Sequence, residues 1–315
     1  MSHSNGCYGS LAVVKFGGSV LGGAKTYRRA ARFLRNRLEA APGDRYVAVV
    51  SAQAGATDAL ERAARGIVQA PSPRSLDLLW STGEIRSVAL LTLHLEALGV
   101  FAAGLDVQAT GLRVGSTGEV VLDADRLHAT LAGNQVVVVP GFLATNGEHA
   151  IVTLGRGGSD LTAVLLAAGL GAARCELVKD VPGYFSADPH RDPAARHLPA
   201  LTFAETLALA DAGCDLVQRQ AIEAAARAGL PLVVRSLDES APVSVVSAGA
   251  QPTGRAARLP ASEKFDPTTV EKKEKQYGIR HPNDSRGPAL GTRNRSAHRP
   301  HLSNLHVRAG GAGLR

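Results

Sequence analysis

The sequence predicts an α/β fold in which a mostly parallel sheet is covered by helices on both faces. Short runs rich in β-branched residues alternate with amphipathic helical patterns between residues 11 and 246. Such alternation is typical of parallel strands joined by crossover helices. Hydrophobic residues make up 45% of the 315-residue chain, so a substantial core is possible.

Each element follows from its own run of residues. The apolar runs predict strands at Leu11–Lys15, Tyr46–Ser51, Val136–Pro140, Ala150–Thr153, Cys175–Val178, Leu232–Arg235 and Val243–Val246. The helical patterns predict helices at Thr26–Ala41, Thr57–Gln69, Glu84–Leu98, Thr162–Leu170, Phe203–Ala212 and Asp215–Ala228. In the first helix one stripe is apolar, and its five arginines are expected to face solvent.

The net charge of +7 is unevenly distributed along the chain. Residues 251–315 carry 13 basic and 5 acidic residues, a net charge of +8. Subtracting these from the totals of 35 and 28 leaves 22 basic and 23 acidic residues for residues 1–250. A nucleic-acid partner is therefore not expected for the folded part, and binding by the basic tail is a weaker alternative.

Cysteine usage and hydropathy bear on the compartment. Cys7, Cys175 and Cys214 have unrelated spacings and form no disulfide framework, which fits a reducing cytoplasm. The polar N-terminus predicts no signal peptide. The most apolar stretch, residues 88–105, contains ionisable side chains, so a core helix and strand are expected rather than a membrane span. The histidines of the tail have no ligand spacing, and no protein metal site is expected.

The run Thr153–Thr162, T-L-G-R-G-G-S-D-L-T, is the most informative for function. A strand, a glycine-rich turn and a helix start direct backbone N–H groups at an anion. Arg156 would grip a carboxylate or phosphate in two-point fashion, and Asp160 would orient lysines or a metal. The alternative is a plain glycine-rich turn with a serine or aspartate cap.

A second glycine loop makes that alternative less attractive. Lys15-Phe16-Gly17-Gly18-Ser19 follows an apolar run, and its lysine precedes the glycines, unlike a Walker P-loop. Phosphoryl transfer needs positioned cations and N–H donors more than covalent help from the protein. Both loops follow strands, and ligands of open α/β sheets bind at carboxyl strand ends, so we expect the loops to share one cleft.

Together these segments resemble the aspartate kinases of the amino acid kinase superfamily, which transfer phosphate from ATP to the side-chain carboxylate of aspartate. The resemblance extends from about Val13 to about Ser236. The similar segments are Lys15–Ser19, Ser51–Asp58, Ser81–Glu84, Thr153–Thr162, Lys179–Gly183 and Ala187–Pro189. The resemblance implies a three-layer αβα sandwich, ATP and Mg²⁺ as cofactors, and a homodimer.

The resemblance also implies roles for individual residues. Lys15 and Asp160 would be catalytic. Substrate binding would involve Ser51, Glu84, Arg156 and Ser159, with Glu84 on the substrate ammonium and Arg156 on its α-carboxylate. Nucleotide and phosphate binding would involve Gly17, Gly18, Ser19, Gly157, Gly158, Lys179, Asp180, Phe185, Asp188, His190 and Asp215.

The nucleotide segment departs from the family pattern. Phe185 stands where tyrosine is usual, His190 where arginine is usual, and Asp215 where a lysine usually meets the nucleotide phosphates. A carboxylate near those phosphates would repel them, and Lys179, at a usual threonine position, would partly compensate. We therefore expect a kinase with a changed nucleotide site, which acts on aspartate or a close analogue. The alternative is a non-catalytic subunit that binds a ligand or regulates an active kinase.

The domain organisation follows from the same segments. We expect a flexible N-terminus at residues 1–10, an amino acid kinase domain at 11–250, and a basic, disordered tail at 251–315. The tail lacks the patterns of the two small regulatory domains that many aspartate kinases carry. Feedback inhibition through such domains is not expected unless a separate subunit supplies them.

Overall fold

The computed structural model describes residues 9–155, 157–189 and 191–249. Arg156, His190, most of the predicted flexible N-terminus and the predicted tail lie outside the described residues. Gly9 and Ser10 are already tied to the fold, because they pair with the backbone of Gly43 and Arg45.

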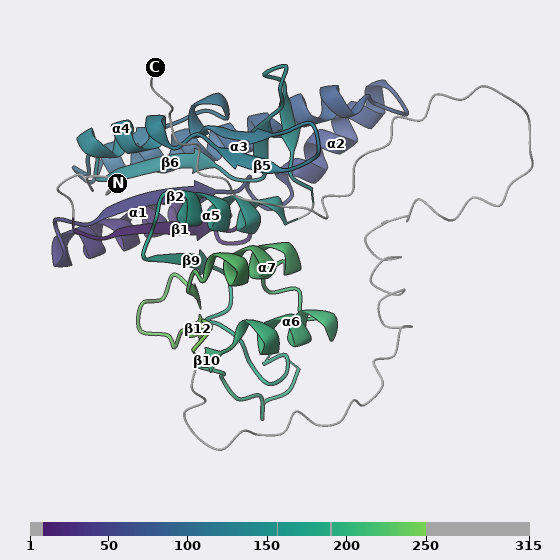
Figure 1. Cartoon of the computed structure of the whole chain (residues 1–315). Coiled ribbons are helices and arrows are strands. Elements are labelled where there is room, and N and C mark those ends of the chain that lie inside the picture. Colours follow the sequence, from purple (N-terminus) through teal and green to yellow (C-terminus); the bar gives the residue numbers. More distant parts are fainter. Residues whose placement is uncertain (1–8, 156, 190, 250–315) are drawn as a thin grey trace, which may run out of the picture. The chain divides into compact units, whose positions relative to one another are not determined.

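The main sheet has eight strands in the order β10-β12-β11-β9-β1-β2-β6-β3 (Figure 1). Every neighbouring pair is parallel except β11 with β12, which confirms the predicted mostly parallel sheet. The strands are β1 (Leu11–Phe16), β2 (Arg45–Val50), β3 (Ala102–Gly104), β6 (Val136–Pro140), β9 (Arg174–Val178), β10 (Ala200–Leu201), β11 (Leu232–Arg235) and β12 (Ser244–Val246).

Helices cover both faces of this sheet, as predicted. On one face, α1 (Ala24–Ala40) and α3 (Pro73–Glu96) pack on alternate residues of β1 such as Val14. On the other, α4 (Asp125–Gly133), α5 (Gly158–Gly169) and α7 (Arg219–Ala228) share a core with Val13. Two further helices extend these layers: α2 (Ala56–Ile67) contacts α3, and α6 (Phe203–Asp211) contacts α7.

A second sheet, which the sequence did not predict, has four short strands in the order β5-β4-β7-β8. They are β4 (Leu112–Val114), β5 (Val120–Leu122), β7 (Leu143–Thr145) and β8 (Ile151–Thr153). The predicted strand at Ala150–Thr153 is thus β8, which pairs antiparallel with β7 instead of joining the main sheet. Three-residue strands are too short for a hydrophobic period to reveal them.

Three helices begin four or more residues away from the predicted start. α3 begins at Pro73 rather than Glu84, because Ser72 caps it by accepting a hydrogen bond from the Ser75 N–H at 3.2 Å and proline suits the first turn. α5 begins at Gly158 rather than Thr162, directly after the glycine turn. α7 begins at Arg219 rather than Asp215, and α4 was not predicted.

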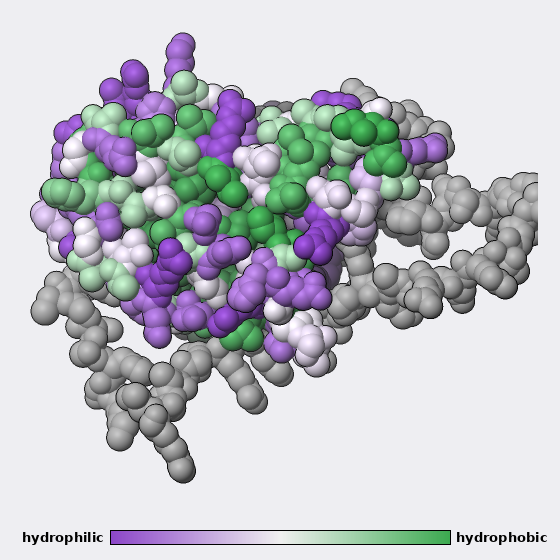
Figure 2. All heavy atoms as spheres, turned by 90° about the horizontal axis from the view of Figure 1, so that it is seen from above, coloured by the Kyte–Doolittle hydropathy of each residue, from purple (hydrophilic) through white to green (hydrophobic). Residues whose placement is uncertain are grey.

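Hydrophobic side chains also reach the surface, between hydrophilic ones (Figure 2). Among the described residues, Leu78, Ile85 and Leu93 are large apolar side chains exposed on α3. No helix in the described ranges is long and apolar enough to cross a bilayer.

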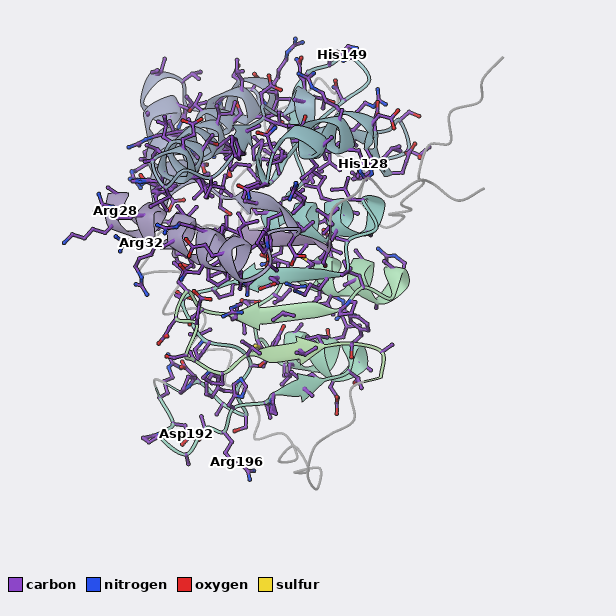
Figure 3. The ribbon with its side chains drawn as sticks, turned by 90° about the vertical axis from the view of Figure 1, so that its left-hand side faces the viewer. Arg28, Arg32, His128, His149, Asp192 and Arg196 are labelled. Carbon is purple, nitrogen blue, oxygen red and sulfur yellow. The ribbon has the colours of Figure 1, made fainter. Side chains whose placement is uncertain are left out.

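The arginines of α1 only partly follow the prediction of a solvated face. Arg28 and Arg32 point outward from the helix (Figure 3). Arg37 instead reaches inward and pairs with the buried Glu176 of β9 at 2.7 Å, so the prediction was wrong for this residue. A helical period places a residue on a face but does not reveal an acid on a neighbouring strand.

Candidate active site

The centre of the site is a carboxylate held between two lysines. Lys15 Nζ lies 2.8 Å from Asp160 Oδ1, and Lys179 Nζ lies 2.8 Å from Asp160 Oδ2. The carboxylate is buried, and both lysine side chains are mostly buried. Two ammonium groups and one carboxylate leave one positive charge, so this cluster favours an anion.

Three different elements supply these side chains. The pleat of β1 turns Lys15 towards the face that α5 covers, because its neighbours Val14 and Phe16 pack on the opposite face. Asp160 lies in the first turn of α5, where the helix dipole favours negative charge. Lys179 directly follows β9, which pairs with β1. The two predicted glycine loops therefore meet, although one of them follows a strand of the second sheet.

The loop after β1 packs tightly against its surroundings. Gly17 donates a backbone hydrogen bond to the Val178 carbonyl at 3.3 Å. A Cβ at Gly18 would lie only 2.6 Å from the Ala52 carbonyl oxygen, so glycine is required there. Ser19 is exposed at the end of the loop.

Electrostatics keep the central carboxylate ionised. Burial opposes ionisation of Asp160, but the charges and hydrogen bonds of Lys15 and Lys179 outweigh it and hold its pKa below 3.8. Burial lowers the pKa of Lys179 below 10.5, an effect that Asp160 opposes and Lys15 strengthens. Both lysines therefore depend on the same ionised carboxylate, that of Asp160, for their ion pairs.

Glu84 on α3 is a second buried carboxyl group. It is 4% exposed, and its Oε2 has no hydrogen-bond partner among the described residues. Burial raises its pKa to about 8, against the opposing effects of a backbone hydrogen bond from Ala52 and the charge of Lys15. A buried acid without a full set of partners is suited to receive a cationic ligand group.

Gln218, which the sequence did not single out, packs against the glycine turn. Gly157 has φ 75°, and a Cβ there would lie 1.8 Å from Gln218 Cγ. The backbone N–H of Gln218 points to Asp160 Oδ2 at 3.5 Å. The contact joins residues 58 positions apart, so no local pattern could reveal it.

The turn after β6 supports the start of α5. Gly141 packs on Ser159, since a Cβ at Gly141 would lie 2.7 Å from Ser159 Cβ. Phe142 has φ 68°, which is rare outside glycine, and its N–H donates to Thr162 Oγ1 at 3.1 Å. The Pro-Gly pair before Phe142 was the available sequence signal for this turn.

The model of the amino acid kinase family matches residues 10–236. The chain belongs to the amino acid kinase family.

Individual relatives agree with this assignment. An aspartokinase of Pseudomonas aeruginosa is 38% identical over 242 residues, which cover 76% of this chain and 58% of the relative. Aspartokinase 2 of Bacillus subtilis is 37% identical over 234 residues, which cover 73% of this chain and 57% of the relative. The chain thus spans little more than half the length of these curated relatives.

Solved structures share the fold. Aspartate kinase from Synechocystis has a TM-score of 0.68 and 36% identity, covering 78% of this chain and 41% of that chain. Aspartokinase III of E. coli in complex with aspartate and ADP has a TM-score of 0.63 and 26% identity, covering 77% and 65%. These neighbours confirm the predicted α/β fold.

The remaining predicted residues are spread more widely. Ser51 is half-buried directly after β2, and its N–H donates to the Phe16 carbonyl. Phe185 stacks edge-on against His197 at 5.3 Å, and Asp188 lies 3.6 Å from Arg191. Phe185 and Asp188 therefore both contact residues of the segment between β9 and β10.

Two acids of the predicted nucleotide region are exposed. Asp180 follows Lys179, and Asp215 lies before α7. Within the described ranges Asp215 forms no hydrogen bond or ion pair. Arg156 and His190 fall outside those ranges, so their predicted roles stay predictions.

Proposed function

We propose that this chain transfers the γ-phosphoryl group of ATP to the side-chain carboxylate of an amino acid, L-aspartate to 4-phospho-L-aspartate or a close analogue. The observation that carries the proposal is the Lys15–Asp160–Lys179 cluster, which holds an excess positive charge where the two glycine loops meet. The aspartokinase relatives support the choice of aspartate.

The proposal assigns a task to each part of the site. Lys15 and the N–H groups of Gly17 and Gly18 stabilise the transferred phosphoryl group. Asp160 orients the lysines. Glu84 holds the substrate ammonium, and Arg156 holds the α-carboxylate. Ser51 and Ser159 complete the substrate end as hydrogen-bonding hydroxyl groups.

The residues present fit ATP with Mg²⁺. The phosphates would lie against the two lysines and the N-terminus of α5, which favours anions. In the described part of the chain, no group of three or more His, Cys, Asp or Glu side chains could hold a metal ion. Mg²⁺ would therefore be held by phosphate oxygens and water, as is common for this ion, and would neutralise phosphate charge when bound.

A binding or regulatory subunit is the second candidate. It is favoured by the exposed acid Asp215, which would repel a nucleotide phosphate brought near it. This candidate retains aspartate binding at Glu84 and predicts no turnover.

The proposal extends to assembly and compartment. A homodimer is supported by the exposed apolar stripe of Leu78, Ile85 and Leu93 on α3, whose burial between two copies would be favourable. Light scattering should then give twice the mass of one chain for the native protein, and the mass of a single chain for Ile85→Glu. The cytoplasm is proposed because Cys175 and Cys214 are free thiols.

A coupled ADP-release assay tests the activity, with hydroxylamine to trap an acyl phosphate as a hydroxamate. We expect hydroxamate from L-aspartate with Mg·ATP, and far less from succinate, which lacks the ammonium that Glu84 would bind. Asp160→Asn should abolish turnover. If folded protein gives no hydroxamate with L-aspartate, L-glutamate or related dicarboxylic acids, the kinase proposal is wrong. Calorimetric binding of aspartate without Mg·ATP binding would favour the second candidate.

A further inference from the structure

Lysine is used sparingly in this fold and is concentrated at one carboxylate. The described residues contain three lysines, Lys15, Lys25 and Lys179, and two of them contact Asp160. Lys25 is exposed on α1, and the other basic side chains of this part are arginines and histidines. A compact ammonium group is suited to contact phosphate oxygens as a point charge.

Lys179 is held in place by both its backbone and its side chain. Its N–H donates to the Arg235 carbonyl at 2.8 Å, which fixes the end of β9 against β11. Its Nζ lies 2.8 and 3.1 Å from the two oxygens of Asp160. The preceding residue, Val178, accepts the hydrogen bond from Gly17. Lys179 therefore lies beside the start of the glycine loop at residues 17–19.

The charge balance of this cluster favours an anion. Lys15 and Lys179 together carry two positive charges, Asp160 supplies one negative charge between them, and the exposed Asp180 has a smaller effect on Lys179. Burial disfavours the charged form of Lys179, and the carboxylate that chiefly offsets this is shared with Lys15, so a further anion would stabilise the charged lysine. The transferred phosphoryl group is such an anion.

The segment that leads into α7, up to its first residue Arg219, offers no alternative cation among its described side chains. Asp215 is an exposed acid, and Gln218 is uncharged. Arg219 is committed to two acidic side chains at the surface, Asp211 and Glu223. Within the described residues, Lys179 is the basic side chain that joins Lys15 at the carboxylate of Asp160.

We infer that Lys179 is a catalytic residue that contacts oxygens of the γ-phosphoryl group during its transfer, together with Lys15. The inference rests on the proposed kinase function. It places the second cation of the site at Lys179, because Asp215, at the position where the family usually has a lysine, is an acid. The bond between Pγ and the β–γ bridging oxygen breaks, and an acceptor carboxylate oxygen bonds to Pγ. ADP leaves with the electron pair, no proton is transferred, and both lysines act by charge.

The test compares Lys179→Met, which removes the positive charge, with Lys179→Arg, which keeps the charge but carries it on a planar guanidinium group. Lys25→Met is the matched control, because Lys25 is exposed. We expect Lys179→Met to lower kcat by about 100-fold or more, as for loss of one group that stabilises transition-state charge. KM for the amino acid should change little, and calorimetry should show weaker binding of Mg·ATP. Lys179→Arg should retain more activity, and Lys25→Met should match the native protein.

Unchanged kcat and unchanged Mg·ATP affinity in Lys179→Met would overturn the inference while leaving the kinase proposal intact. Absence of turnover in the native protein would instead overturn the kinase proposal, and with it the catalytic role of Lys179. Thermal unfolding of each variant separates these outcomes from loss of fold. If Lys179→Met does not fold, Lys179→Gln, which also removes the charge but keeps a polar side chain, takes its place. Unchanged kcat and unchanged Mg·ATP affinity in Lys179→Gln would overturn the inference.

Discussion

At the scale of single residues, burial keeps one acid of the site, Glu84, protonated in the free protein at neutral pH. Glu84 is buried with one oxygen unpartnered, and its pKa is raised to about 8, chiefly by burial. Its folded state therefore retains a proton that the unfolded chain releases above about pH 4.5. Stability falls as the pH rises from that value towards 8, so Glu84 costs stability at neutral pH.

Glu84→Gln should therefore stabilise the free protein at pH 8 by an amount on the order of a few kcal/mol, since each pKa unit corresponds to about 1.4 kcal/mol. Below pH 4 the difference should vanish, because the carboxyl group is then protonated in both states. Thermal or urea unfolding at the two pH values measures this. An equal effect at both pH values would contradict the expectation.

The same substitution should weaken aspartate binding. The substrate ammonium favours the ionised carboxyl group, so binding releases a proton and the affinity of the native protein should rise between pH 6 and 8. In Glu84→Gln the affinity should fall by roughly 100-fold or more, as for loss of a buried charge partner, and its pH dependence should flatten. Calorimetry in two buffers of different ionisation enthalpy detects the released proton.

Gly157→Ala tests the contact between the glycine turn and Gln218. A Cβ at Gly157 would overlap Gln218 Cγ at 1.8 Å and so displace the segment whose N–H points to Asp160. Gly229→Ala is the matched control, since Gly229 also has positive φ, 60°, but open space around it. Both variants should lose about 1 kcal/mol or more of stability from the positive φ, but only Gly157→Ala should lose most of its kcat. Equal kcat in the two variants would contradict this role.

At the scale of elements, a buried ion cluster joins α1, β9 and β11 away from the lysines. Glu176 accepts hydrogen bonds from Arg37 and Arg174, and Arg235 lies 3.8 Å from its other oxygen. Arg37 and Arg235 also lie over the Phe33 ring. The sheet register pairs Glu176 with Val14, on the face opposite Lys15, so this cluster serves the fold rather than the site.

Glu176→Gln should lower the free energy of unfolding at pH 7 by about 3–5 kcal/mol, since it leaves the mostly buried guanidinium groups of Arg37 and Arg235 without their anion. Burial opposes ionisation of Glu176, but Arg37 and Arg174 outweigh it and lower its pKa below 4.5. The stabilisation is thus fully present above pH 4.5 and is lost as the pH falls through the folded pKa. Glu39→Gln, which removes an exposed pair with Arg35, should cost under about 0.5 kcal/mol. Urea unfolding between pH 3 and 7 measures both the loss of unfolding free energy in each variant and its dependence on pH.

The elements also show how far the sequence could predict this molecule. The buried strands follow from their β-branched runs, and the meeting of Lys15 with Asp160 follows from two loops at strand ends. The second sheet could not be predicted, because strands of three residues carry no period. Nor could the contact of Gln218 with Gly157 or the inward turn of Arg37, because both depend on partners distant in sequence.

At the scale of the whole molecule, the site couples ligand binding to folding. Lys15 comes from β1, Asp160 from α5 and Lys179 from the end of β9, so the cluster forms only when these elements are assembled. A ligand that satisfies the excess positive charge must therefore bind the folded chain in preference to the unfolded chain, and it stabilises the fold by mass action.

Mg·ATP at about 100 times its Kd should raise the free energy of unfolding by about 2.7 kcal/mol, which corresponds to several degrees in Tm for a domain of this size. L-aspartate should add to this shift, because Glu84 holds a separate group. Lys179→Met should reduce the shift from Mg·ATP by removing one of the two cations, whereas Glu84→Gln should remove only the shift from aspartate. Differential scanning fluorimetry with each ligand alone and with both together measures these shifts in Tm. A shift from Mg·ATP that is the same in Lys179→Met and in the native protein would place the nucleotide away from the lysine cluster.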